Sequence, residues 1–397
     1  MSQQNPVFIP GPTNIPEALR KACDMPTMDH RSSAFKDILH PARDVVAQVL
    51  RSATAEVFIF PATGTGGWEA AIANTLSAGD AVLAGRNGMF SHRWIDMCTR
   101  HGLDVQVLEH RWGQGLEAAA YEAALRADTD HRIKAVLATH NETATGVVSD
   151  IAAIRRAMDA VGHPALLMVD GVSSIGSMDF RMQEWGVDIA VTGSQKGFMM
   201  PAGLAIVGVS TKAMAHIDGA GLARCFFDFR DMQAGYAANA YPYTPAVGLL
   251  NGLKVAGEML LEEGLETVIA RHHYMAEGVR MAVRGWGLQL CAETPDVYSD
   301  TVSAILVPEG HDASAIVTRA ADVYGTAFGA GLGEVSGKVF RIGHLGMITE
   351  GMLLQGIATA EMVMADIGVP VAMGSGVAAA QEYYRAAKSH TFDLAAE

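Results

Sequence analysis

Short apolar runs alternate with longer amphipathic stretches along the first half of the chain. The apolar runs cover residues 56–60, 81–84, 105–108, 135–139, 165–170, 187–192 and 204–209. Between them lie stretches with helical periodicity, namely 67–75, 93–100, 118–126 and 151–161. Short strands that are apolar on both faces and separated by helices are typical of a mostly parallel sheet covered on both sides. This part of the chain is therefore predicted to be a doubly wound α/β domain.

The two ends of the chain have a different pattern. Residues 16–52 read mostly as helix, and residues 246–284 form a long helical pattern. From Gln289 onward a few strands, 301–307 and 338–342, lie between helices, which indicates a smaller C-terminal α+β domain. We therefore expect three parts: an N-terminal segment 1–20, a large domain 21–285 and a small domain 286–397.

The bulk composition is that of a globular protein. Half of the 397 residues are apolar and 18% are charged, a balance that allows large cores and does not resemble a disordered chain. The formal net charge of -14 disfavours non-specific binding to nucleic acid or to an anionic membrane. An anionic ligand therefore needs a defined pocket.

The four cysteines lie far apart and form no CxxC pair, which argues against a zinc site or a disulfide framework. We expect no metal. The first residues lack a basic segment followed by an apolar core, and no apolar stretch approaches the roughly 20 residues needed to cross a bilayer. The cytoplasm is the expected location.

A small-residue turn, PATGTGGWEAAI, follows the strand that ends at Phe60 and leads into a helix. Such a turn offers free backbone N–H groups and the positive end of a helix dipole, which together bind phosphate. Thr63 and Thr65 add hydroxyl donors. The GxGxxG pattern is absent, and no acidic residue ends the next strand, so a dinucleotide site is disfavoured. A plain tight turn is the alternative.

Two charged residues follow neighbouring strands of the predicted sheet. Asp170 ends the run LLMVD, and Lys196 lies in TGSQKGFM, directly after the next strand. Ligands bind beyond the carboxyl ends of strands in open α/β sheets, so these groups and the phosphate-type turn should meet. Each alone has a simpler explanation: Asp170 as a turn cap, Lys196 as surface charge. Together they match pyridoxal phosphate, which needs a carboxylate for its ring nitrogen, a lysine amine and a phosphate cradle.

The whole chain resembles a known family. The matching stretches are FIPGPTN, PATGTGGWEAAI, NGMFSHRW, THNETATGV, VDGVSSIG, TGSQKGF, YPYTP and KVFRIGHLG. These resemble the class V, fold type I, pyridoxal phosphate aminotransferases, and within them the alanine/serine-glyoxylate group, most closely its bacterial serine-glyoxylate type. The resemblance implies a fold type I transferase with a small C-terminal domain.

The resemblance implies a role for each residue around the cofactor ring. Lys196 matches the Schiff-base lysine, and Asp170 matches the partner of the pyridine nitrogen. Val172 would pack under the ring and Phe90 would stack on its other face, where some relatives have tryptophan. Thr143 would hydrogen-bond the phenolic oxygen of the ring. A core aromatic and a polar loop are the alternatives for Phe90 and for the stretch around Thr143.

Other positions match the phosphate cradle and the substrate clamp. The cradle residues would be Thr63, Gly64, Thr65 and Gln195. Tyr241 and Thr244 match residues that reach the phosphate of a neighbouring subunit, which implies a homodimer. Arg341 matches the arginine that grips the substrate carboxylate through two parallel hydrogen bonds. Asn14 lies in the GPTN segment that resembles one closing over the substrate.

The implied reaction moves the amino group of a small L-amino acid to glyoxylate. Serine ranks first as the donor and alanine third. Aspartate is a serious rival, although it would need an extra cation near its side chain. A lyase or desulfurase is one alternative, for which Cys291 would have to lie on a mobile loop. A protein that binds the cofactor without turnover is another.

Overall fold

The computed structural model of the chain describes the backbone of residues 6–394 and the side chains of residues 6–388. Its large domain is built on a seven-stranded sheet. In spatial order the strands are β2 (Glu56–Ala62), β10 (Gly203–Val209), β9 (Ile189–Gly193), β8 (Leu166–Asp170), β5 (Ile133–Thr139), β3 (Ala81–Arg86) and β4 (Asp104–Glu109). Strand β10 is antiparallel to both neighbours, and the strands from β9 to β4 pair in parallel. The predicted α/β fold with a mostly parallel sheet is confirmed.

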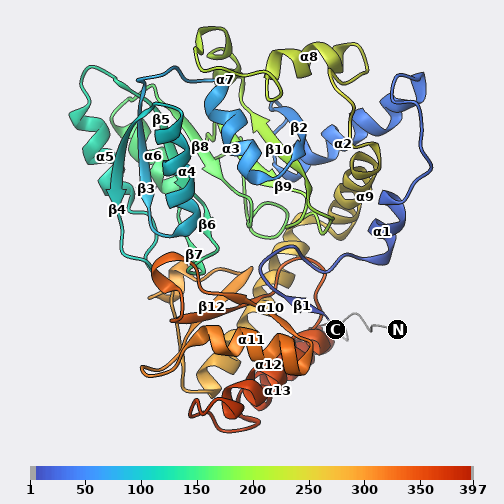
Figure 1. Cartoon of the computed structure of the whole chain (residues 1–397), viewed down its shortest axis with the longest axis vertical. Helices are drawn as coiled ribbons and strands as arrows, with labels where there is room; N and C mark the ends of the chain where they lie inside the picture. The colour runs from blue at the N-terminus through green and yellow to red at the C-terminus, as the bar shows by residue number, and fades with distance from the viewer. Residues whose placement is uncertain (1–5, 395–397) are drawn as a thin grey trace.

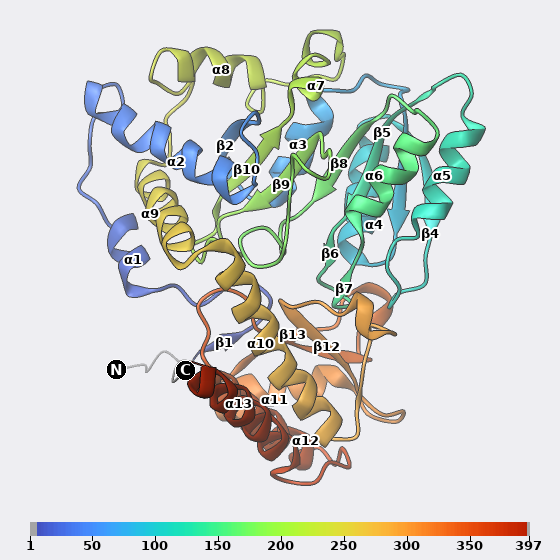
Figure 2. The ribbon, with the colours of Figure 1, turned by 180° about the vertical axis from the view of Figure 1, so that it is seen from behind.

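Helices cover both faces of this sheet, as the two opposite views show (Figures 1 and 2). They are α1 (Glu17–Cys23), α2 (Lys36–Val49), α3 (Gly64–Ala73), α4 (Met89–Arg100), α5 (Ala118–Ala127), α6 (Ile151–Ala160), α7 (Thr211–Met214), α8 (Phe229–Ala237) and α9 (Val247–Glu263). A two-stranded hairpin of β6 (Asn141–Glu142) and β7 (Val147–Val148) follows β5. The central strands β5, β8 and β9 are buried on both faces and read as continuous apolar runs, whereas the edge strand β4 is partly exposed.

The stretch 16–52 is mostly helical, as predicted, but its helix is interrupted: α1 ends at Cys23 and α2 begins only at Lys36. The residues between them form loop and a short 3-10 turn at Ser33–Phe35. Pro26 lies in this gap, and a proline both lacks the N–H that a helix needs and disfavours helical geometry in the residue before it.

The small domain has its own sheet, which lies below the large domain in Figure 1. Its strands, in order, are β1 (Val7–Phe8), β13 (Ala327–Ala330), β14 (Val339–Gly343), β12 (Val302–Leu306) and β11 (Gln289–Leu290). Its helices are α11 (Ala313–Tyr324), α12 (Glu350–Asp366) and α13 (Ser375–Leu394). The N-terminal strand β1 therefore belongs to the small-domain sheet, and the chain continues from it into the large domain.

Helix α10 (Leu265–Gly285) links the two domains and runs obliquely between them (Figure 2). Val268, near its start, belongs to the core of the large domain. Val279 and Val283, further along, belong to the second core, together with Phe340 of β14. The boundary predicted between residues 285 and 286 falls at the far end of this linking helix.

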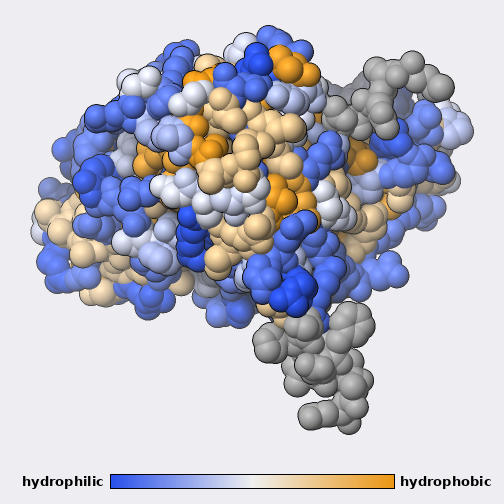
Figure 3. Space-filling model, turned by 90° about the horizontal axis from the view of Figure 1, so that it is seen from below, coloured by the Kyte–Doolittle hydropathy of each residue, from blue (hydrophilic) through white to orange (hydrophobic). Residues whose placement is uncertain are grey.

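The end of the molecule formed by the small domain carries apolar side chains in its centre, with hydrophilic residues around them (Figure 3). Among the residues that the structure describes, no helix is both long and apolar enough to cross a membrane.

Candidate active site

A cavity of about 240 Å³ lies beyond the carboxyl ends of β2, β8 and β9. Its lining is Gly11, Pro12, Thr63, Gly64, Thr65, Trp68, Phe90, Thr143, Asp170, Val172, Ser173, Gln195, Lys196 and Ala202. The structure thus brings together every large-domain residue proposed for the cofactor except Tyr241 and Thr244. The position follows from topology, because the carboxyl ends of parallel strands meet at one edge of the sheet.

Helix α3 begins at this cavity with its backbone donors unused. Thr63 is extended at the position before the helix, and the first helical hydrogen bond runs from the N–H of Gly67 to the oxygen of Thr63, at 3.2 Å. The earlier N–H groups of the turn have no partner within the helix. Gly64 has to be glycine because a methyl group there would lie 2.5 Å from a methyl of Val172. The turn is therefore suited to an anion close to its backbone.

Asp170 ends β8 and is buried. Its Oδ1 accepts a hydrogen bond from the N–H of Val172 at 2.9 Å. Burial raises the pKa of Asp170 to about 7, and the Val172 N–H opposes this rise. No cation forms an ion pair with Asp170 among the described residues, so its carboxylate is left to meet a cationic group of a ligand.

Lys196 approaches the same cavity from the loop after β9. Its Nζ donates to the carbonyl oxygen of Pro10. A side chain at Gly11 would overlap the lysine, and the φ of +101° at Gly11 also favours glycine. Burial lowers the pKa of Lys196 to about 8; the charge of Arg341 acts in the same direction, and Asp170 opposes both. A larger fraction of this amine is therefore neutral near physiological pH than of an ordinary lysine, and a base or nucleophile requires the neutral form.

Two apolar groups and a hydroxyl pair complete the lining. Phe90 and Val172 lie on the wall, and the guanidinium carbon of Arg93 lies 5.4 Å from the centre of the Phe90 ring. The Thr143 and Ser173 hydroxyls are 2.7 Å apart. These groups give a planar ligand two apolar contacts and a polar edge.

Arg341 reaches this region from the small domain, in β14. Its Nε donates to the oxygen of Ala330 at 2.9 Å, and its Nη1 donates to the oxygen of Thr143 at 3.0 Å. Burial lowers the pKa of Arg341 to about 10, and the negative charge of Glu142 opposes this. Its Nη2 makes no hydrogen bond within the described part of the chain. A buried guanidinium with an uncommitted nitrogen is suited to a carboxylate.

Four of the proposed residues are not part of the cavity lining: Arg341, which is attached to it through Thr143, and Asn14, Tyr241 and Thr244. The side chain of Asn14 instead bonds the N–H and the oxygen of Val7, each at 3.0 Å, and so fixes the N-terminal segment. The hydroxyl of Tyr241 donates to Ile59 at 2.8 Å, and Thr244 is exposed on the same loop. Roles for Tyr241 and Thr244 in a neighbouring subunit stay predictions.

Among the lining residues that sequence reasoning missed are two with polar side chains, Trp68 and Ser173. Both carry a positional signal, because Trp68 lies three residues after Thr65 on α3 and Ser173 lies three residues after Asp170. The Gln195 Oε1 is buried without a hydrogen-bond partner among the described residues, whereas the Trp68 indole faces the Asp170 carboxylate and opposes the rise of its pKa. Buried polar atoms are normally satisfied, so Gln195 Oε1 is available to a ligand.

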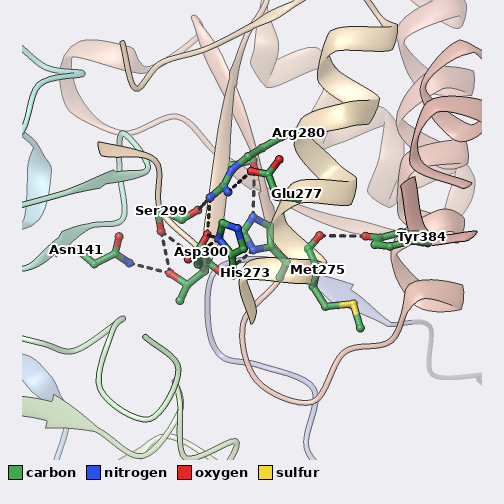
Figure 4. A network of polar contacts seen from close by, with 11 residues as sticks. Asn141, His273, Met275, Glu277, Arg280, Ser299, Asp300 and Tyr384 are labelled. Carbon is green, nitrogen blue, oxygen red and sulfur yellow. Dashed lines mark hydrogen bonds and ion pairs between the residues drawn. The ribbon is translucent and has the colours of Figure 1, made fainter. Parts of the chain in front are cut away.

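A polar network anchors the loop after β5 to the small domain (Figure 4). The Asn141 amide donates to the hydroxyl of Thr301 at 2.7 Å, which is 3.1 Å from the hydroxyl of Ser299. The carbonyl of Ser299 in turn accepts from Arg280, at 2.7 Å. The loop that carries Thr143 is therefore fixed from both domains.

Comparison with known proteins agrees with this geometry. A family model described as aminotransferase class-V matches residues 19–322. The chain belongs to the class-V aminotransferases. It is 68% identical over 385 residues, 97% of each chain, to the L-aspartate-glyoxylate aminotransferase of Paracoccus denitrificans. It is 53% identical over 389 residues, 97% of this chain and 96% of the relative, to the serine-glyoxylate aminotransferase of Hyphomicrobium methylovorum.

Solved structures give the same result for the fold. The pyridoxamine-pyruvate aminotransferase of Mesorhizobium loti superposes with a TM-score of 0.90 at 29% identity, covering 97% of this chain and 99% of that chain. The predicted family and the assignment as a transaminase are thus confirmed.

The residues present in this class-V aminotransferase fit pyridoxal phosphate. The helix start at Gly64 offers free N–H groups for a phosphate, and Asp170 offers a buried carboxylate without a cation for a ring nitrogen. Lys196 offers an amine whose pKa is lowered to about 8, for an aldehyde. Phe90 and Val172 offer apolar contacts for the ring. Each chemical feature of the cofactor has a matching group.

Three other residues with reactive or charged side chains, His344, Arg20 and Cys291, do not line the cavity. His344 is fully buried against Ser303 and the oxygen of Asp300, and burial lowers its pKa to about 3, so it is neutral. Arg20 pairs with Glu17 on the surface. Cys291 is buried beside Ala304, and burial raises its pKa to about 11. A buried, protonated thiol does not suit the desulfurase alternative.

Proposed function

We propose that this protein is a pyridoxal phosphate-dependent transaminase that moves the amino group of a small L-amino acid to glyoxylate, giving glycine and a 2-oxo acid. The observation that carries the proposal is the meeting of Asp170, Lys196 and the start of α3 around one cavity. Arg341 is attached to the same cavity through Thr143. Relatives with 68% and 53% identity are named as glyoxylate aminotransferases.

The bound cofactor would supply a sink for the electron pair that remains when the α-carbon of the substrate loses its proton. Lys196, as a neutral amine, would anchor the aldehyde, take that proton at Nζ and return it to the carbon that was the aldehyde carbon of the cofactor. Asp170, ionised, would hold the positive charge of the ring nitrogen. Arg341 would bind the carboxylate of the donor and then that of glyoxylate in the same place.

The phosphate would be held by Thr63, Gly64 and Thr65 at the start of α3, with Gln195 beside them. The segment at Gly11 and Pro12 would cover the lysine and exclude water from the proton transfer.

The proposal also names the amino donor. The lining of one chain contains no cation other than Lys196 among the described residues, and such a cavity suits serine. The 68% identity to an aspartate enzyme favours aspartate, whose second carboxylate would then require a cation from a partner subunit. We favour L-aspartate on the strength of that similarity, with L-serine as the alternative.

A homodimer is part of the proposal. The loop that carries Tyr241 and Thr244 also carries Tyr243, which stacks on Phe226 with ring centres 5.0 Å apart. Phe226 is 40% exposed, which is unusual for so large an apolar side chain. A second copy that covers this face would bring Thr244 near its phosphate site. The cytoplasmic location stays a prediction.

The test is to mix the purified protein with pyridoxal phosphate, glyoxylate and one amino donor, and to follow glycine. We expect glycine to form, with a kcat/KM for aspartate at least about 10-fold above that for serine. Failure to form glycine with any donor would refute the proposal and leave the alternative of a protein that only binds the cofactor. A higher value for serine would reverse the donor assignment alone.

Mixed dimers test the shared site. Lys196→Ala and Thr244→Ala chains each carry a lesion in both sites of their own dimer. If Thr244 serves the other subunit, a mixed dimer contains one site with both lesions and one intact site. Activity should therefore rise on mixing, and a mixture no more active than its components would contradict a shared site.

A further inference from the structure

Glu142 is a buried carboxylate beside the site for which the reaction gives no role. It ends β6 and its side chain is fully buried. Within the described residues it forms no ion pair. A buried charge without a cation is costly, so its hydrogen bonds have to compensate for it.

The donors to Glu142 come from the first turn of α4 and from its own loop. Its Oε2 accepts the N–H groups of Phe90 and Ser91, each at 3.0 Å, and the Ser91 hydroxyl at 3.1 Å. Its Oε1 accepts the N–H of Ala144 at 3.1 Å. A side chain at Gly88 would overlap Glu142, so the helix start is fitted closely around this carboxylate. A negative charge at a helix N-terminus is also stabilised by the helix dipole.

This geometry connects Glu142 to the wall of the cavity on one side. The amide that it fixes belongs to Phe90, whose ring lines the cavity. The next residue in the chain, Thr143, also lines the cavity and is hydrogen-bonded to Ser173 at 2.7 Å. The carboxylate therefore ties together two elements, α4 and the β6 loop, that face the same ligand space.

Glu142 is connected to the substrate arginine on the other side. Arg341 donates to the oxygen of Thr143, directly after Glu142. The charge of Glu142 also opposes the fall that burial causes in the pKa of Arg341, and it contributes to the rise in that of Asp170. One carboxylate thus acts on both charged groups that flank the cavity.

We propose that Glu142 is a positioning residue, which holds Phe90 against the cofactor ring and keeps Thr143 in place to orient Arg341. The inference rests on the proposed function and extends it to a residue that touches neither cofactor nor substrate. If it is correct, loss of the Glu142 charge weakens cofactor binding and substrate capture together, beyond any effect on folding.

A second buried glutamate provides a matched control. Glu361 of α12 is 1% exposed and also accepts N–H groups at a helix start, from Gly376 at 2.7 Å and Val377 at 3.0 Å in α13. It accepts the indole N–H of Trp286 at 2.9 Å as well. All these partners lie in the small domain, and none of them lines the cavity.

The experiment compares Glu142→Gln with Glu361→Gln. Pyridoxal phosphate is titrated into each apo-protein, with tryptophan fluorescence as the readout, and the Tm of each apo-protein and kcat/KM for glyoxylate are measured. We expect both variants to lower Tm, and only Glu142→Gln to raise the Kd for pyridoxal phosphate, by about 10-fold or more, and to lower kcat/KM by about 100-fold. Ser91→Ala, which removes one donor and keeps the charge, should raise the Kd by about 3-fold.

The inference is overturned if Glu142→Gln keeps the Kd and kcat/KM of the parent, or if Glu361→Gln loses as much of both. If Glu142→Gln does not fold, Ser91→Ala decides, and an unchanged Kd overturns the inference. A parent protein that neither binds pyridoxal phosphate nor forms glycine refutes the proposed function, and this inference with it. A parent that does both, with a Glu142→Gln variant equal to it, refutes this inference alone.

Discussion

The cavity of the large domain and the polar network of the small domain both bury charge, but they treat it differently. In the network, Arg280 pairs with Glu277 at 2.5 Å and with Asp300 at 2.7 Å (Figure 4). In the cavity, Asp170 and Lys196 form no ion pair with each other or with another residue of the described chain, and the pKa of each is shifted towards neutrality.

This difference in pairing indicates which charges stabilise the fold and which are available to a ligand. Charges that are satisfied within the chain stabilise one arrangement of the elements around them. Charges left without partners cost stability, and such a cost is retained where a ligand supplies the missing partner. We therefore expect mutations in the cavity to change chemistry more than stability, and mutations in the network to do the reverse.

Lys196→Ala should have the largest effect. The variant lacks both the covalent anchor and the base, so turnover should fall by at least about 10⁴-fold, and the visible absorbance of the bound cofactor should disappear. Lys212→Ala is the control, because Lys212 pairs with Asp188 away from the cavity. A Lys196→Ala variant that keeps its absorbance and turnover would show that the cavity is not the catalytic site.

Asp170→Asn should lower kcat by about 10³-fold, since the neutral amide cannot stabilise a cationic ring nitrogen.

In the parent, the pKa of Asp170 is raised to about 7, so the affinity of the apo-protein for pyridoxal phosphate should increase as pH rises through that value. The raised pKa also means that the apo-protein loses stability as the pH rises from the ordinary carboxyl value to about 7, because the folded state holds that proton more tightly. Titrations at several pH values check both statements, and a variant with the same pH dependence as the parent would contradict them.

Arg341→Lys should have a smaller and more selective effect. A lysine cannot form two parallel hydrogen bonds to a carboxylate, so kcat/KM for glyoxylate should fall by about 100-fold. The Kd for pyridoxal phosphate should change by less than about 2-fold, as the cofactor makes no use of this side chain. Arg319→Lys, at the surface pair with Asp366, is the control. Steady-state kinetics would contradict the assignment if KM for glyoxylate were unchanged.

Arg280→Met should have the smallest effect on activity and the clearest effect on stability. It leaves Glu277 and Asp300 without their cation, so the free energy of unfolding should fall by about 3 kcal/mol. The folded enzyme should keep kcat/KM within about 2-fold of the parent. Urea unfolding and kinetics on the same preparation check this, and a large loss of kcat/KM at unchanged stability would remove the distinction between the two regions.

Much of the large domain could be predicted from the sequence because its strands are buried on both faces. The runs at 135–139 and 204–209 become β5 and β10 within two residues of their predicted bounds. The antiparallel direction of β10 could not be predicted, because the hydrophobic periodicity of a strand contains no information on its direction. The pairing of β1 with β13 in the small-domain sheet could not be predicted either, because strands far apart in the sequence leave no local signal of their pairing.

Some residues of the site could likewise be predicted from the sequence, and others could not. Asp170 and Lys196 could be located because each directly follows a strand of a parallel sheet, where ligands bind. The hydrogen bonds of Glu142 to α4 could not be foreseen, as they join residues more than fifty positions apart. The side chain of Asn14 was expected near the substrate, and its local bonds to Val7 show how a short polar side chain serves its own backbone first.

The central claim is that the amine of Lys196 binds the aldehyde of pyridoxal phosphate in this cavity. The most direct measurement is to incubate the protein with pyridoxal phosphate, reduce the mixture with sodium borohydride, digest it and locate the added mass by peptide mass spectrometry. The account predicts a stoichiometric tag on Lys196. A tag spread over surface lysines, with Lys196 unmodified, would contradict it.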